Sequence, residues 1–154
     1  MRNQSRLVIG GDRSSFRTAG KSLLARAVRR RITPRLVSPR DKDELLDYDL
    51  GITNIVARTT AAAAELSDEE LRAGAAILRR KVHRYKPRVL AVLGVGAYRT
   101  GFGIKTATLG LQNETIGQTK IWILPNPSGL NAHFTPKALG ALFLAFNESL
   151  KSLD

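Results

Sequence analysis

The chain has 154 residues, a net charge of +12 and 43% hydrophobic residues, as expected of one globular domain with a substantial core. It has no cysteine and only two histidines, which excludes disulfides and cysteine-based metal sites and disfavours a histidine-rich zinc site. No apolar run approaches the ~20 residues needed to span a bilayer, so we expect a cytoplasmic protein with no signal peptide and no membrane partner.

The first forty residues are strongly basic. They contain eleven Arg and Lys against one acid, Asp12, which gives this segment +10 and leaves +2 of the total of +12 for the rest of the chain. A basic arm that binds nucleic acid is one explanation. A second explanation, set out below, is that residues 1–31 are read out of frame.

Three apolar stretches rich in branched side chains predict buried strands: Ile52–Val56, Val89–Leu93 and Ile121–Leu124. Between the first two, Ser67 and Glu70 have the spacing of a capping box, and apolar residues recur with helical period as far as Tyr85. The glycine-rich stretches 94–96 and 101–103 match no phosphate-binding spacing and are predicted to be turns.

A second helix is predicted after the third strand, with Thr135 as its cap and Pro136 at its first position. Its apolar stripe comprises Leu139, Leu142, Phe143, Phe146, Leu150 and Leu153. The basic run from Arg79 to Arg88 lies largely off the apolar side of the first helix. We interpret it as a solvated face, with contact to phosphates as the alternative.

Strands that alternate with helices predict a three-layer α/β/α sandwich with a short, mostly parallel central sheet. Binding loops of such sheets lie beyond the carboxyl ends of the strands. This rule places Asn54 and the segment after Leu124 at one edge of the sheet.

The segment after the third strand has an unusual composition, Pro125-Asn126-Pro127-Ser128-Gly129-Leu130-Asn131. Prolines fix φ and glycine permits a sharp reversal, while Asn126, Ser128 and Asn131 supply hydrogen-bonding side chains. The pattern holds one apolar side chain, Leu130, on a stiff tip flanked by polar groups. Such a side chain can enter a base stack as a wedge. The alternative is an ordinary strand-to-helix connection.

This segment resembles the second signature of the mismatch-specific uracil/thymine-DNA glycosylases, a family of the uracil-DNA glycosylase superfamily. The resemblance continues upstream in ITPRLVSP, LLDYDLGITNIVART, ELSDEELRAG and VLAVLGVGAYRTGFG, and covers roughly residues 32–150. It divides the chain into a basic segment, 1–31, that we expect to pack poorly, and a glycosylase-like domain, 32–154.

The resemblance implies hydrolysis of the N-glycosidic bond of uracil or thymine mispaired with guanine, in base-excision repair. The partner is then double-stranded DNA containing the mispair, bound by a monomer without metal or organic cofactor. By resemblance, the residues that enter the duplex and contact the orphaned guanine are Asn126, Pro127, Ser128, Gly129, Leu130 and Asn131. Asn54 corresponds to a pocket-side position of the family.

The family's first motif, Gly-Ile-Asn-Pro-Gly, is absent, and with it the asparagine that positions the attacking water. The family's base-stacking Phe segment is absent as well. Asn3 is the only asparagine among the first 31 residues, and its surroundings do not match. We therefore name no catalytic residue and expect excision by this chain to be crippled. We also expect the first strand of the sheet to be missing or degraded.

Both missing motifs can be recovered by a shift of one base. With suitable permitted codons, Met1–Arg6 becomes Cys-Gly-Ile-Asn-Pro-Gly, and Arg13–Leu24 becomes a segment that ends in Asn-Arg-Phe-Trp. Because one constant shift restores both in the right order, we interpret residues 1–31 as an out-of-frame reading, with Met1 a spurious start. The alternative is a genuine basic helix over Lys21–Arg31.

Two other functions compete with an active glycosylase. One is a non-catalytic DNA-binding remnant that keeps the wedge but does not activate water. The other is an unrelated basic RNA-binding protein. Glycosylase-derived functions predict a preference for mispaired duplex, whereas RNA binding predicts a preference for single strands or RNA structure.

Overall fold

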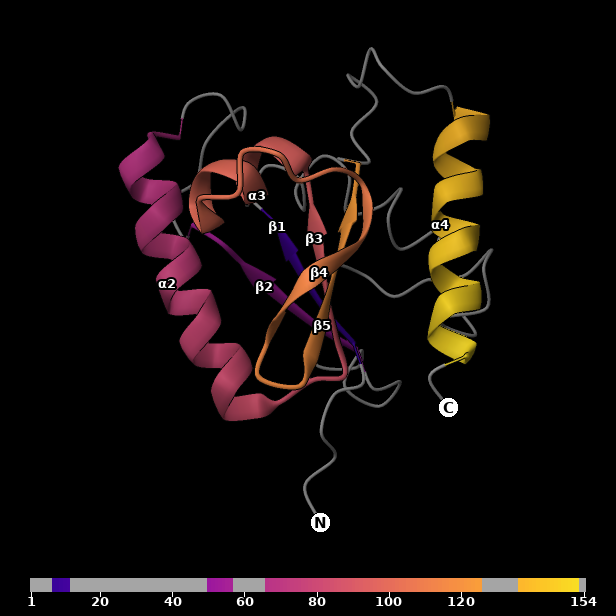
Figure 1. Cartoon of the computed structure of the whole chain (residues 1–154), viewed down its shortest axis with the longest axis horizontal. Helices are drawn as coiled ribbons and strands as arrows, with labels where there is room; N and C mark the ends of the chain where they lie inside the picture. The colour runs from indigo at the N-terminus through magenta and orange to yellow at the C-terminus, as the bar shows by residue number, and fades with distance from the viewer. Residues whose placement is uncertain (1–6, 12–49, 57–65, 126–135, 153–154) are drawn as a thin grey trace.

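The computed structural model describes residues 7–11, 50–56, 66–125 and 136–152 (Figure 1). In these ranges the elements are β1 (Leu7–Gly11), β2 (Leu50–Asn54), α2 (Asp68–Tyr85), β3 (Val89–Leu93), α3 (Val95–Phe102), β4 (Gly110–Ile116), β5 (Thr119–Leu124) and α4 (Pro136–Lys151).

The strands form one sheet in the order β2-β1-β3-β5-β4. β1 pairs in parallel with β2 and β3, and β3 pairs in parallel with β5, whereas β4 is antiparallel to β5. The four parallel strands therefore end at one side of the sheet, which we call the carboxyl edge. Their last residues are Gly11, Asn54, Leu93 and Leu124.

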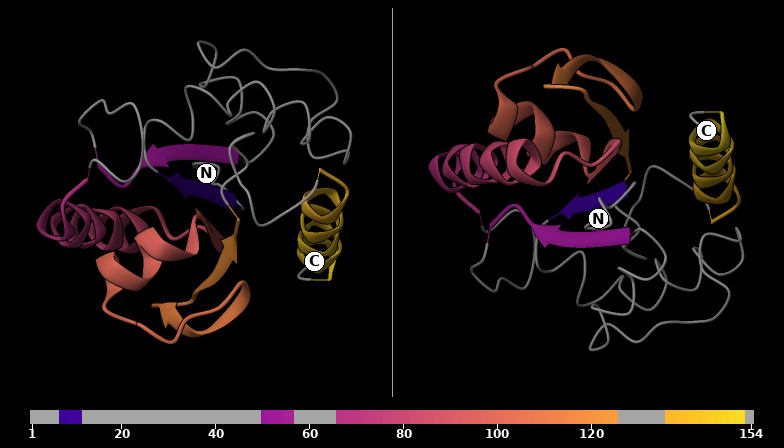
Figure 2. Two further views of the ribbon diagram at one scale, coloured as in Figure 1. Left: turned by 90° about the horizontal axis from the view of Figure 1, so that it is seen from above. Right: turned by 90° about the horizontal axis from the view of Figure 1, so that it is seen from below.

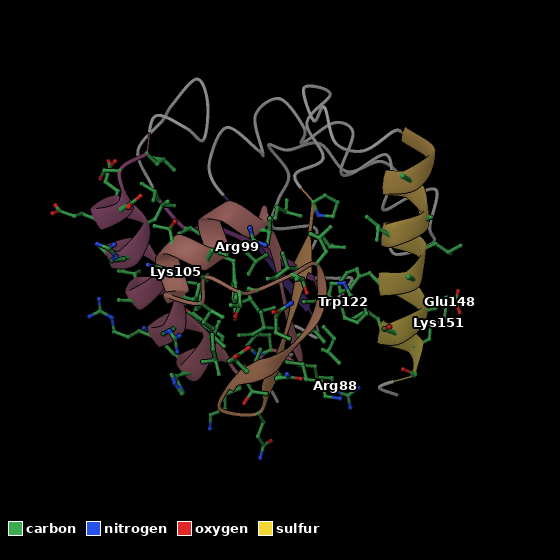
Figure 3. All side chains as sticks on the ribbon, turned by 45° about the horizontal axis from the view of Figure 1, so that its top comes forward. Arg88, Arg99, Lys105, Trp122, Glu148 and Lys151 are labelled. Atoms are coloured by element: carbon green, nitrogen blue, oxygen red, sulfur yellow. The ribbon has the colours of Figure 1, made fainter. Side chains whose placement is uncertain are left out.

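Helices lie on both faces of the sheet, with α2 and α3 on one face and α4 on the other (Figure 2). On the first face, Leu78 and Val82 of α2 belong to one buried cluster with Leu90 and Val92 of β3. On the other face, the ring of Trp122 (labelled in Figure 3) lies 5.4 Å from that of Phe146 of α4. The predicted α/β sandwich with a mostly parallel sheet is confirmed.

β3 is the most deeply buried strand. Its five residues are 0–3% exposed, and a paired strand lies on each side of it. The prediction of a continuous apolar strand over Val89–Leu93 is correct residue for residue. Such a run suits a parallel strand buried on both faces.

We expected the first strand of the sheet to be missing or degraded. This expectation is wrong, because β1 lies in the sheet between β2 and β3. Its run Leu7-Val8-Ile9 has the branched apolar character of a buried parallel strand. β2 covers Leu50–Asn54 rather than the predicted Ile52–Val56, so that Ile55 and Val56 are buried just beyond the strand.

The helix predicted to begin at Ser67 is confirmed. The Ser67 hydroxyl accepts the backbone N–H of Glu70 at 3.1 Å, and the Glu70 carboxylate accepts the backbone N–H of Ser67 at 2.8 Å. The helix ends at Tyr85 and is capped by Lys86, whose φ of 48° is left-handed, just before Pro87. The basic residues from Arg79 to Arg88 are all exposed, as predicted for a solvated face.

The glycine-rich stretches 94–96 and 101–103 were predicted to be turns, and this is wrong for Val95, Gly96, Gly101 and Phe102, which belong to α3. Gly94 and Gly103 flank α3 with positive φ, whereas Gly96 and Gly101 lie inside the helix. The helix α4 begins at Pro136 as predicted and buries Phe146 from the predicted stripe. Thr135 lies outside the described residues.

Among the described residues, no helix is both long enough and apolar enough to cross a membrane.

A glycine lets α2 approach the chain that leaves β2. A Cβ on Gly74 would overlap the backbone carbonyl oxygen of Ile55, the residue that follows Asn54. This obstacle is backbone, which cannot rotate away as a flexible side chain can. The contact therefore fixes where β2 ends relative to α2.

We expect Gly74→Ala to lower the free energy of unfolding by about 1–2 kcal/mol, because the clash exceeds the ~1 kcal/mol that alanine gains over glycine in a helix. Gly96→Ala is the matched control, since no atom lies within 4 Å of its added Cβ. That variant should gain up to about 1 kcal/mol. Chemical denaturation measures both changes, and a Gly74→Ala protein as stable as Gly96→Ala would contradict the close approach.

Candidate functional site

The candidate site lies along the carboxyl edge. β5 delivers the chain there, since Leu124 is its last residue and Pro125, which is buried, follows it. The six residues predicted to enter DNA, Asn126 to Asn131, come next in the sequence and lie outside the described residues. The strand directions confirm the prediction that the chain leaves β5 toward this segment at the carboxyl edge.

Asn54 is the last residue of β2 and pairs in register with Gly11 of β1. The backbone thus carries it to the same edge as the end of β5, as predicted. β1 and β3 lie between β2 and β5, so about 14 Å separate the two strand ends at ~4.8 Å per strand. The side chain of Asn54 is outside the described residues.

A hydrogen bond joins the two central strands at this edge. The N–H of Gly94, just after β3, donates to the carbonyl of Leu124 at 2.8 Å. Gly94 has φ of 99°, a conformation that favours glycine, and its carbonyl accepts the N–H of Tyr98 at 3.3 Å as α3 begins. The start of α3 and the departure point of the 126–131 segment are therefore held together.

The other end of the edge is held by α2. Besides the contact of Gly74 with Ile55, the ammonium group of Lys81 donates to the Thr53 hydroxyl at 3.2 Å. Both contacts flank Asn54 in the sequence. The contacts of its two neighbours in the sequence therefore fix where the backbone of Asn54 lies.

α3 is fixed by a buried aromatic pair. Tyr98 is 0% exposed and stacks on Phe102 with ring centroids 4.7 Å apart, and the Arg79 guanidinium lies 4.8 Å from the Phe102 centroid. On the same helix, Arg99 donates from Nε to the Ala107 carbonyl at 2.8 Å. These contacts anchor the helix that follows β3.

The Tyr98 hydroxyl is buried and has no hydrogen-bond partner among the described residues. Burial raises the pKa of Tyr98, Glu114 raises it further, and Arg79 opposes them. The phenol therefore stays neutral at physiological pH. Because the hydroxyl is enclosed, Tyr98 serves packing rather than proton transfer.

Sequence reasoning located the 126–131 segment and Asn54 but missed the residues that position them. Gly74 carried a usable signal, because a glycine inside a strongly periodic helix often marks a close approach. The pairing of Lys81 with Thr53 had none, since the two residues are 28 positions apart. The described residues contain no group of His, Cys, Asp and Glu suited to a metal ion.

Comparison with known families agrees with this architecture. The sequence profile of the uracil DNA glycosylase superfamily matches residues 10–151. The chain belongs to this superfamily. Its members are DNA glycosylases, hydrolases that act on uracil in DNA and serve DNA repair.

The match begins at residue 10, inside the segment 1–31 that the sequence analysis set apart. β1 lies in that segment too, at Leu7–Gly11. The boundary at residue 31, the poor packing of the segment and its out-of-frame origin stay predictions.

We expect Tyr98→Phe to raise the free energy of unfolding at neutral pH by about 1 kcal/mol, because it removes a buried hydroxyl without a partner. The wild type should also lose stability as the pH rises above ~10, because tyrosine ionises in the unfolded chain while the raised pKa keeps Tyr98 neutral in the folded one. The variant lacks this alkaline loss. Denaturation at neutral and alkaline pH measures both effects.

Tyr85→Phe is the control, because Tyr85 is 58% exposed and its hydroxyl is hydrated. A Tyr98→Phe protein less stable than wild type at neutral pH would mean that the hydroxyl has a partner, contrary to our interpretation.

Proposed function

We propose that this chain binds duplex DNA containing uracil or thymine opposite guanine, as a mismatch-directed member of its superfamily. The observation that carries the proposal is the end of β5 at the carboxyl edge, immediately before Asn126–Asn131. That segment has the Asn-Pro-Ser-Gly-Leu signature of the mismatch-specific family. The parallel sheet supports it, because ligands of such sheets bind beyond the carboxyl ends of the strands.

Binding requires the mispaired base to leave the stack and enter a pocket. In our proposal Leu130 fills the space that the base leaves, while the polar groups of Asn126 and Asn131 bond the guanine left behind. Asn54 approaches the extruded base from the end of β2, at the other end of the carboxyl edge. The separation of ~14 Å between the ends of β2 and β5 suits this division of roles.

Excision would then require water to attack the sugar as charge develops on the departing base, through an oxocarbenium-like transition state. The family positions that water with the asparagine of a Gly-Ile-Asn-Pro-Gly motif, which this sequence lacks. We therefore propose that excision by this chain is strongly impaired. A protein that binds the mispair and leaves the glycosidic bond intact is the second candidate function, favoured by the same missing motif.

We expect Leu130→Ala to weaken binding to a duplex with one G:U mispair by about 1–3 kcal/mol, the scale of one stacking contact with a base. Binding to the fully paired duplex should change far less, since no gap opens there for the side chain to fill. Fluorescence anisotropy with both duplexes at one salt concentration measures the difference. Leu144→Ala, an exposed leucine on α4, is the matched control. An equal loss on both duplexes would refute the wedge.

The 154-residue chain should excise uracil at least about 10²–10³ times more slowly than a chain in which the frame is restored before Ile32. The reason is that one well-placed polar group in an active site commonly contributes that much to the rate. The assay compares both proteins on one G:U duplex under identical salt. Tight binding of the G:U duplex by the 154-residue chain without excision would support the second candidate function. Equal excision rates would show that residues 1–31 are not misread.

A further inference from the structure

A cavity of about 590 Å³ lies at the end of the sheet opposite the carboxyl edge. His83 and Lys86 line it from the end of α2, Arg88 from the start of β3, and Gln118 and Lys120 from the β4–β5 hairpin. We call it the amino-edge groove. Arg88 is seen at this lower end of the molecule, away from Arg99 on α3 (Figure 3).

The groove is cationic. Lys86, Arg88 and Lys120 carry positive charge and are exposed, and no acidic residue is among the described residues that line it. Gln118 and His83 add further hydrogen-bonding groups. In the last turn of α2, between His83 and Lys86 in the sequence, the Arg84 guanidinium lies 5.5 Å from the ring centroid of the exposed Tyr85. Positive charge beside an aromatic ring is the combination that nucleic-acid backbones and bases favour.

The walls of the groove are tied together before any ligand binds. The Thr119 hydroxyl donates to the Pro87 carbonyl at 2.6 Å, and the Lys120 N–H donates to the Arg88 carbonyl at 3.0 Å. The hairpin turns at Gly117, whose φ is 60°. These bonds hold Lys120 against the connection between α2 and β3, which carries Lys86 and Arg88. A site formed in advance loses less entropy when it binds.

The backbone at Lys86 also points to a function. Its φ of 48° and ψ of 53° are left-handed, and it is the only non-glycine residue with positive φ in the described part of the chain. Glycine is the usual residue where a helix ends in this way. A lysine held there at a conformational cost is consistent with a use for its side chain.

We propose that the amino-edge groove binds the phosphate backbone of a second segment of nucleic acid, without sequence preference. β3 alone puts roughly 16 Å between the two edges at ~3.3 Å per residue. The groove faces away from the carboxyl edge, so its cations serve phosphates other than those beside the mispair. The inference rests on the proposed function in one respect only. It calls this segment of nucleic acid the second because the first is the mispaired duplex proposed for the carboxyl edge.

The test measures the affinity of the full-length chain for a short undamaged duplex between about 50 and 200 mM salt. Each lysine–phosphate contact contributes ~0.9 to the slope of log K against log salt. Lys86→Gln with Lys120→Gln should therefore make the slope shallower by about 2. Lys151→Gln is the charge-matched control for Lys86→Gln alone and for Lys120→Gln alone, since Lys151 pairs with Glu148 on α4 outside the groove. A double variant with the wild-type slope, or a control that loses as much as each single variant, would overturn the proposal.

Lys86→Gly separates binding from folding. Glycine suits the left-handed backbone, so the melting temperature should equal or exceed that of wild type while the slope becomes shallower by about 1. An unchanged slope in this variant would count against a phosphate contact by Lys86.

A second measurement identifies the ligand class. Wild-type protein on an immobilised G:U duplex should retain a labelled undamaged duplex, and the double Lys variant should lose that retention while still binding the G:U duplex. Stronger competition by anionic lipid vesicles, or by inorganic phosphate alone at equal phosphate concentration, would overturn the assignment to nucleic acid. The slope on undamaged duplex does not depend on G:U preference, so failure of the proposed function is distinguishable from failure of the groove.

Discussion

The parallel pairing of β3 with β1 on one side and β5 on the other is the constraint on which the site depends. A strand buried on both faces must satisfy its backbone groups through its neighbours, because no water reaches them. Parallel pairing also makes the strands end at one edge. Gly94 adds a further link between β3 and β5. Its N–H donates a hydrogen bond to the carbonyl of Leu124, the last residue of β5 before the chain continues toward the 126–131 segment.

The helix α2 packs closely against the residue that follows β2 and against α3. Gly74 admits the Ile55 carbonyl, and on the other side a Cβ on Gly101 of α3 would lie 3.0 Å from the Leu71 carbonyl. Side chains at these contacts would push α2 away from its neighbours. Close backbone packing thus sets the position of α2 relative to the residue that follows β2 and to the last turn of α3.

Local patterns predicted the parts of the fold in which one segment determines its own structure. The capping box of Ser67 and Glu70 and the apolar run of β3 are of this kind. α3 escaped prediction because the cost of Gly96 and Gly101 in a helix is offset by the burial of Tyr98, a tertiary effect. β4 escaped because its sequence, GLQNETI, is mostly polar, as an edge strand permits. For the site, the resemblance predicts Asn126–Asn131 and Asn54, and their roles stay predictions. The amino-edge groove joins two separate stretches of chain, 82–88 and 116–120, and no local pattern could bring them together.

The two ends of the sheet present different chemistry, and this bears on how the protein would work on DNA. In our proposal, recognition at the carboxyl edge depends on shape, because a wedge and a pocket require a base that can leave the stack. Binding at the amino-edge groove, as we propose it, depends on charge, which acts equally on every stretch of duplex. Affinity for undamaged DNA and preference for a mispair can therefore change independently of each other. A chain without the water-positioning asparagine would keep both binding properties and lose only the bond cleavage, because neither the wedge segment nor the groove includes the missing motif.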